Sequence, residues 1–221
     1  MMPMTDNKNE HVIIIHGMGL YPFWMKRIER HLKKAGYHTH NIGYPSRKFS
    51  IPDLVEDHIK PAIDAIPEDA TALHFVTHSL GSILLRCYHE KYTIKKSGRT
   101  VMMGPPNQGS EVADALKNFR PYKWYFGAAG QALGTKEGDI PPNLSAVKFD
   151  LGIIAGRRHW MHLIAGMIAP RPNDGLVSVQ STKVKGMKDH IVLPIDHSMM
   201  TFYKPALTHM LHFLKNGAFK H

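Results

Sequence analysis

Five short apolar runs are spaced along the chain and are separated by longer, more polar segments. They span residues 12–15, 73–77, 100–103, 151–155 and 191–195, with 38–44 as a weaker sixth candidate. The Val-Ile-Ile-Ile of the first run and the Ile-Val-Leu-Pro-Ile of the last lack the polar alternation of a strand with one wet face. Such runs are typical of strands in a parallel sheet that helices cover on both faces.

The segments between these runs have helical spacing of apolar positions, as at Trp24, Ile28 and Leu32. Helices are predicted over residues 22–35, 51–66, 80–92, 110–119 and 198–214. Alternation of strands and helices predicts an α/β fold with a doubly wound, mostly parallel sheet of about six strands flanked by helices. The ligand site of such a fold lies at the carboxyl ends of the strands.

Residues 120–147 interrupt this alternation. Aromatic residues at 122–126 precede Gly-rich and Pro-rich sequence that ends in Pro141-Pro142. Because 221 residues fit one large domain, we interpret this segment as an inserted loop or lid within a single domain. Two interpretations are open for its aromatic side chains together with Trp160, Met161 and Met167: they line an apolar acyl pocket, or they form an ordinary hydrophobic core patch.

Composition narrows the class of protein. A hydrophobic fraction of 43% and a charged fraction of 21% are ordinary for a globular protein with a sizeable core. The formal charge of +10 is spread over short runs such as Lys33-Lys34, which favours a solvated basic surface with weak attraction to anionic surfaces over specific nucleic-acid binding. Cys87 is the only cysteine, so an intramolecular disulfide and a thiolate zinc site are excluded.

No targeting or membrane-spanning segment is expected. The first residues lack an apolar stretch behind a basic start, so we expect a cytoplasmic protein. The longest apolar patch, at residues 161–169, is much shorter than the roughly 20 residues that cross a bilayer. We therefore predict no transmembrane segment.

The strongest local signal lies at residues 73–82, where an apolar strand leads into Ser79 and then into a helix. A serine on such a sharp turn projects its hydroxyl from the sheet edge, and only small residues fit two positions before and after it. Gly81 meets this requirement, whereas Thr77 stands where the common pattern has glycine. The alternative is a serine that only caps the helix.

A second signal follows the first strand, in His16-Gly17-Met18-Gly19. Acyl transfer needs two N–H donors for the developing oxyanion, and the amides of Met18 and Leu80 are the candidates. A simple tight turn is the alternative. A dinucleotide-binding loop does not fit, because Pro22 stands where its third glycine should be.

A serine nucleophile needs a histidine base and a carboxylate that orients this base. Among sixteen histidines, His197 directly follows the last predicted strand and is the candidate base. His78 adjoins Ser79 but points elsewhere on such a turn, so we expect a structural role. His209 and His212 have helical spacing, and a surface or packing role is favoured over a metal site because no third ligand accompanies them.

Asp174 is the candidate acid. It lies in Asn173-Asp174-Gly175, after the strand at 151–155, and gives the chain order Ser, Asp, His. Asp150 and Asp189 precede their strands and are expected at the wrong edge, and Asp196 is expected to point away from its neighbour His197. An Asp-Gly turn without further role is the alternative.

Together these motifs resemble the α/β-hydrolase superfamily, and within it the small lipase-like and esterase-like members. His16-Gly17-Met18-Gly19 is similar to the family's oxyanion loop, and His78-Ser79-Leu80-Gly81 to its nucleophile elbow. Residues 105–110 and Asn173-Asp174-Gly175-Leu176-Val177 resemble segments of lipase-like members. The likeness extends from about residue 11 to 214, without 120–147.

The resemblance implies a serine esterase that needs no cofactor or metal and cleaves a small-molecule ester with an apolar acyl group. A thioesterase, an amidase and an acyltransferase would use the same triad. A non-catalytic binding protein on the same fold is the alternative of another class, but it would not need Ser79, Asp174 and His197 together.

Overall fold

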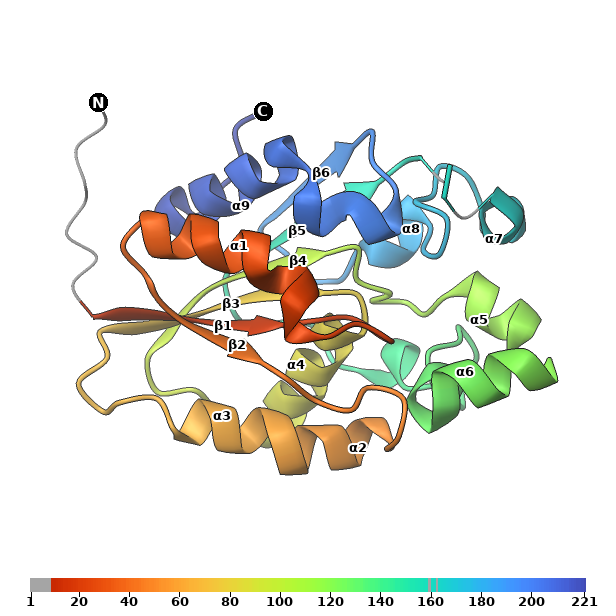
Figure 1. The fold of residues 1–221 in the computed structure, drawn as a ribbon, viewed down its shortest axis with the longest axis horizontal. Helices are drawn as coiled ribbons and strands as arrows, with labels where there is room; N and C mark the ends of the chain where they lie inside the picture. Colours follow the sequence, from red (N-terminus) through yellow and green to blue (C-terminus); the bar gives the residue numbers. More distant parts are fainter. Residues whose placement is uncertain (1–8, 159, 162) are drawn as a thin grey trace.

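A six-stranded, fully parallel sheet forms the centre of the protein in the computed structural model, which describes residues 9–158, 160–161 and 163–221 (Figure 1). The strand order is β2-β1-β3-β4-β5-β6. The strands are β1 (Glu10–Ile15), β2 (His38–Ile42), β3 (Ala72–His78), β4 (Ser97–Met103), β5 (Leu151–Gly156) and β6 (Asp189–Leu193). The predicted α/β fold is confirmed, and the strand order reverses between β1 and β3, where ligand sites of such sheets lie.

The last strand differs from its prediction. It was expected over residues 191–195, but β6 ends at Leu193. Pro194 has no N–H and cannot continue the ladder, and the amide of Ile195 donates to the carbonyl of Leu193 at 2.8 Å instead. The chain therefore leaves the sheet two residues early and reaches His197 through a short loop.

Helices cover both faces of the sheet, as Figure 1 shows. The side chains of Val12 and Ile14 belong to one core layer and those of Ile13 and Ile15 to the other, which explains the unbroken apolar run in β1. On the first face lie α1 (Pro22–Lys34) and α9 (Lys204–Asn216), and on the second α2 (Ile51–Leu54), η1 (Val55–Ile59), α3 (Lys60–Asp64) and α4 (Leu80–Lys91).

Two predicted helices are less regular than expected. The segment at 51–66 contains a π-helical turn, in which the Lys60 amide bonds to the Val55 carbonyl, and Pro61 follows without an N–H of its own. The segment at 198–214 divides at Tyr203 into the 3₁₀-helix η3 (His197–Phe202) and α9. Pro205 lies in the first turn of α9, where its missing N–H costs no hydrogen bond.

The interpretation of residues 120–147 as a loop is wrong for their first half, which forms α6 (Arg120–Gln131). Gly127, with φ of 60°, kinks this helix against the carbonyl of Arg47. Its role as a lid remains a prediction. The other elements are α5 (Glu111–Leu116), η2 (Pro141–Asn143), α7 (Leu163–Ile168) and α8 (Val179–Thr182), of which α5 and α7 gather with α6 at the edge where the strands end (Figure 1).

No helix among the described residues combines the length and the apolar character that a bilayer crossing requires.

Candidate active site

Ser79 lies on a sharp turn between β3 and α4. Its φ of 50° and ψ of −121° are rare for a residue with a side chain and are held only where the surroundings enforce them. The turn packs tightly on the end of β1, because a Cβ atom on Gly81 would lie 2.6 Å from the Ile15 carbonyl oxygen. Only glycine fits at position 81, as the sequence pattern requires.

Thr77 is accommodated where the common pattern has glycine. Its Oγ1 lies 2.7 Å from the Oγ of Ser82, and both side chains are fully buried. The two hydroxyls therefore satisfy each other inside the core. This pair links the end of β3 to the first turn of α4, across Ser79.

His197 and Asp174 meet Ser79 at the carboxyl edge of the sheet. The Nε2 of His197 lies 2.9 Å from the Ser79 Oγ, and its Nδ1 lies 2.7 Å from the Asp174 Oδ2. This geometry fixes the tautomer, because a carboxylate can only accept: the Nδ1–H donates to Asp174 and Nε2 accepts from the serine hydroxyl. The serine hydroxyl, the imidazole and the carboxylate are thus connected in one hydrogen-bonded row.

The carboxylate of Asp174 makes the imidazole of His197 more basic. Burial of His197 disfavours its charged form, but the negative charge and the hydrogen bond of Asp174 offset this, and the pKa of His197 is raised above its ordinary value. Asp196 adds a smaller contribution in the same direction. A histidine in this setting readily takes a proton from a hydroxyl beside it.

Asp174 is itself held rigidly and is fully buried. Its Oδ1 accepts hydrogen bonds from the amides of Leu176 and Val177 at 3.1 and 2.8 Å. Its carbonyl oxygen accepts from the His197 amide at 2.9 Å. Asp174 therefore holds His197 through both its carbonyl oxygen and its carboxylate. The Asp-Gly motif in the sequence does not show these contacts.

The other aspartates have different partners. Asp196 accepts hydrogen bonds from the amides of Ser198 and Met161 at 3.2 and 3.1 Å. Asp150 precedes β5 and pairs with Lys188, and Asp189 begins β6, so both lie at the amino edge of the sheet. The structure thus places these three acids as the sequence predicted.

The loop at residues 16–19 lies directly beside the serine. A Cβ atom on Gly17 would stand 3.1 Å from the Ser79 Cβ and 2.7 Å from the His78 Nδ1, so glycine permits this approach. Met18 and Ser79 border the same cavity. Leu80 is the first residue of α4, a position where the amide has no intrahelical acceptor.

That cavity is small and apolar, with a volume of about 60 Å³. Val112, Leu133, Tyr122 and Phe126 contribute to its walls, so the aromatic segment supplies part of an apolar pocket beside the serine. Trp160, Met161 and Met167 do not border it, and their exposed fractions are 65%, 56% and 76%. The pocket interpretation and the core-patch interpretation are therefore both wrong for these three side chains.

His78 and His16 are two further buried histidines, and both lie next to residues of the site in the chain. The Nε2–H of His78 donates to the His197 carbonyl at 3.0 Å, and the ring of His16 stacks on Tyr44 with centroids 4.1 Å apart. Burial lowers the pKa of His78 to about 3 and that of His16 to about 4. Both rings stay neutral, which fits the structural role expected for His78.

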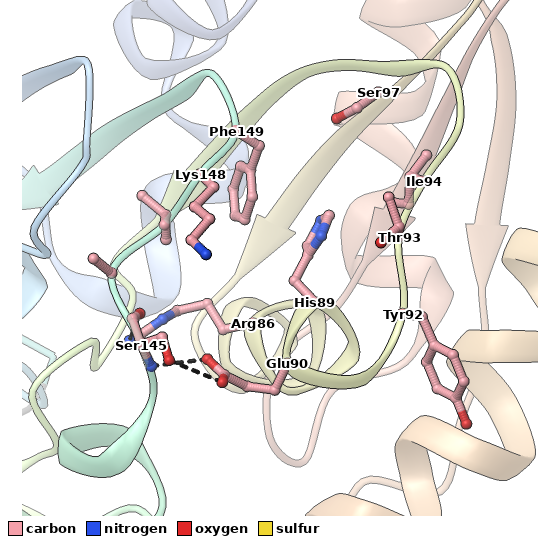
Figure 2. Close-up of a pocket in the computed structure, with 12 residues that line it drawn as sticks. Arg86, His89, Glu90, Tyr92, Thr93, Ile94, Ser97, Ser145, Lys148 and Phe149 are labelled. Carbon is pink, nitrogen blue, oxygen red and sulfur yellow. Dashed lines mark hydrogen bonds between the residues drawn. The ribbon is translucent and has the colours of Figure 1, made fainter.

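A larger cavity of about 460 Å³ lies near the amino ends of β4 and β5, at the edge of the sheet opposite to Ser79. Figure 2 shows the residues that line it. Several of its polar side chains make structural contacts. Glu90 accepts from Ser145 at 2.8 and 3.0 Å, Arg86 donates to backbone carbonyls, and His89 stacks on Phe149 at 4.4 Å. This cavity is larger, but it lacks a nucleophile paired with a base.

The metal interpretation of His209 and His212 finds no support. The Nδ1–H of His212 donates to the Ala218 carbonyl at 2.8 Å, and His209 lies edge-on to Phe219. Within the part of the chain that the structure describes, no group of three or more His, Cys, Asp or Glu side chains is arranged to hold a metal ion.

The strand order and the serine turn after β3 define the α/β-hydrolase fold, and solved structures agree. Over 95% of this chain, a mature lipase from Bacillus licheniformis matches with a TM-score of 0.73, 16% identity and 92% of its own length. A phospholipase from Legionella pneumophila matches with a TM-score of 0.67 and 16% identity, over 95% of this chain and 60% of its own. An esterase from Pyrococcus furiosus matches with a TM-score of 0.59 and 20% identity, over 95% of this chain and 83% of its own. Comparison with protein-family models and with curated proteins gives no match.

Proposed function

We propose that the protein is a serine hydrolase that cleaves carboxylic esters through an acyl-enzyme on Ser79. The observation that carries this proposal is the row from the Ser79 Oγ to His197 at 2.9 Å and from His197 to Asp174 at 2.7 Å. The rare backbone conformation of Ser79 supports it, because strain of this kind persists where the surroundings enforce it for function.

In the proposed reaction, the Ser79 Oγ attacks the ester carbonyl carbon while the Nε2 of His197 takes its proton. The amides of Met18 and Leu80 donate to the oxyanion that forms. The intermediate collapses as His197 returns the proton to the departing alcohol oxygen. Water then attacks the acyl group, again losing its proton to His197, and the acid leaves while Ser79 regains its hydrogen.

The cavity beside Ser79 favours esters with short apolar acyl groups. Its volume of about 60 Å³ is small beside the 430 and 460 Å³ of two other cavities, and its walls are mostly apolar. We expect kcat/KM for p-nitrophenyl esters to be highest for acetate to butyrate and to fall for longer chains. A maximum at long chains would contradict this size limit.

The test of the mechanism is covalent labelling with a fluorophosphonate, read by intact mass. The wild type is expected to gain one adduct, and the Ser79→Ala variant none. Ser97→Ala is the matched control, because Ser97 is exposed at the opposite edge of the sheet; it should label like the wild type. A folded wild type that neither labels nor hydrolyses any ester would overturn the proposal and favour a binding protein.

A further inference from the structure

The exposed apolar side chains are gathered on one part of the surface. All twelve large hydrophobic residues that are exposed among the described residues fall in four segments, at 18–26, 44–50, 119–126 and 157–171. The chain's three tryptophans, Trp24, Trp124 and Trp160, are among them, with exposed fractions of 40%, 85% and 65%. Isolated exposed apolar residues are ordinary, but such a concentration indicates a contact surface.

Three of these segments border one another beside the Ser79 cavity, and the fourth adjoins the loop that carries His197. Tyr21, Arg47 and Trp124 line one hollow of about 430 Å³, and the Arg47 guanidinium lies 4.8 Å from the centre of the Tyr125 ring. The fourth segment is bonded to the loop that carries the base, through Met161 and Asp196. Figure 1 shows α6 and α7 together at the edge where the strands end. We call the described residues of the four segments the entrance surface.

The entrance surface is also strongly basic. Its four segments contain no Asp or Glu, although the chain has 18 acidic residues. Asp174 and Asp196, beside the site, are fully buried. Asp53 is exposed just outside the second segment, where it accepts a hydrogen bond from the Ser50 hydroxyl. The basic residues of the four segments are Lys26, Arg47, Lys48, Arg120, Lys123, Arg157, Arg158 and Arg171.

We propose that the entrance surface docks on an anionic phospholipid bilayer. Tryptophan and tyrosine rings favour the headgroup level of a membrane, and basic side chains between them are attracted to anionic lipids. Aliphatic side chains such as Met167 and Ile168, with exposed fractions of 76% and 38%, suit acyl chains better than nucleic-acid bases. A second copy of the chain fits poorly, because it would oppose two surfaces of the same charge.

Docking in this way would turn the Ser79 entrance toward the bilayer. The binding itself does not depend on catalysis. Only the further consequence, that esters partitioned into the membrane reach Ser79 directly, rests on the proposed function.

The experiment uses the full chain with Ser79→Ala, so that no hydrolysis alters the lipid. Flotation with vesicles of phosphatidylcholine containing phosphatidylglycerol is compared with flotation on phosphatidylcholine alone. We expect binding to the anionic vesicles, weakening as salt rises, and a blue shift of tryptophan emission, since all three tryptophans lie on the entrance surface.

Matched charge reversals locate the docking surface. The pair Lys123→Glu and Arg158→Glu, on the entrance surface, should weaken binding at least about 20-fold, because each basic side chain near an anionic bilayer strengthens binding about fivefold. The pair Lys34→Glu and Lys95→Glu changes the net charge equally at exposed positions outside the entrance surface and should retain nearly wild-type binding. Equal weakening in both pairs would reduce the effect to net charge and overturn the proposal.

Other occupants give distinct results. Absence of vesicle binding together with a concentration-dependent dimer in sedimentation would assign the surface to a second copy. Competition by a random-sequence oligonucleotide, without a tryptophan blue shift on vesicles, would assign it to nucleic acid. Hydrolysis of p-nitrophenyl acetate in solution tests the proposed function separately, so failure of docking and failure of catalysis are distinguishable.

Discussion

Gly104 lies so close to His197 that a Cβ atom at position 104 would stand 3.0 Å from the Nδ1 of the ring. The same atom would stand 3.2 Å from the Oδ2 of Asp174. Gly104 directly follows β4 and has a φ of 57°, a conformation that residues with side chains rarely adopt. The hydrogen bond between histidine and acid therefore depends on a glycine that makes no polar contact with either side chain.

Gly104→Ala is expected to impair both activity and stability. The added methyl group crowds the pair of His197 and Asp174, and we expect kcat to fall about 100-fold, as for a misplaced catalytic group. The strained φ should lower the free energy of unfolding by about 1–3 kcal/mol. Ester hydrolysis and urea unfolding measure the two effects.

Gly138→Ala is the matched control for this substitution, because no atom of the described residues lies within 4 Å of the position where its Cβ would be. It should change neither quantity measurably. Wild-type activity in Gly104→Ala would show that the close approach at position 104 is not needed for catalysis.

Asp174→Asn should lower kcat/KM by about 10⁴-fold with little change in fold. The amide oxygen still accepts from the backbone, but the amide group no longer provides the charge that orients and stabilises the protonated His197. Asp196→Asn is the control, since Asp196 accepts hydrogen bonds from the amides of Ser198 and Met161, whereas the His197 ring is bonded to Asp174 and Ser79. We expect it to lose less than about tenfold. A similar loss in both variants would contradict the assignment of the acid.

The pH dependence of hydrolysis should report the basicity of His197. Its neutral form is the base in the proposed mechanism, and its pKa is raised above the ordinary value of 6.5. The kcat/KM of the wild type should therefore fall as pH decreases through a midpoint above 6.5, by about tenfold per unit below it. In Asp196→Asn the midpoint should move to lower pH, because a negative charge that favours the imidazolium is lost. An unchanged midpoint would contradict that electrostatic contribution.

Much of the fold and the arrangement of the site could be predicted because the signals are local. A strand buried on both faces needs a continuous apolar run, and parallel strands bring their carboxyl ends to one edge, so residues such as Ser79 and His197 were expected together. The early end of β6 also has a local cause, because Pro194 has no N–H to offer the ladder.

The remaining features depend on contacts between distant segments. Gly104 could not be recognised, because only the folded chain brings it against His197. The helix α6 was missed because Pro121, Gly127 and Gly130 are typical of loops, whereas its kink is set by Arg47 in another segment. Thr77 departed from the common pattern, and its partner Ser82 is identified only by the approach of their two hydroxyls.

Arg86 anchors the loops behind the site, and Arg86→Ala should destabilise the protein by about 2–4 kcal/mol. Its guanidinium is buried and donates to the carbonyls of Asn107, Leu144 and Ser145 at 2.8, 3.0 and 3.1 Å. Without it these carbonyls lose their charged donor, which alanine cannot replace. Urea unfolding measures the loss, and a change below about 0.5 kcal/mol would show that water satisfies them equally well.

His89→Phe should make the protein less sensitive to acid. Burial lowers the pKa of His89 to about 4 from its ordinary 6.5. Its Nε2 has no hydrogen-bond partner within the described part of the chain, and its ring stacks on Phe149 (Figure 2). The folded-state pKa is depressed, so between pH 6.5 and about 4 the unfolded chain binds a proton that the folded chain does not. His89 therefore contributes a loss of stability of about 1.4 kcal/mol per pH unit as pH falls through this window.

Phenylalanine keeps the stacking and removes this proton uptake. Urea unfolding at several pH values between 7 and 4 should show a shallower decline for His89→Phe than for the wild type, by up to about 1.4 kcal/mol per unit. The buried histidines His16 and His78, whose pKa values are lowered to about 4 and 3, still contribute in the variant, so its stability should still fall with acid. Parallel declines would mean that the folded protein accepts the proton on His89 as readily as the unfolded chain does.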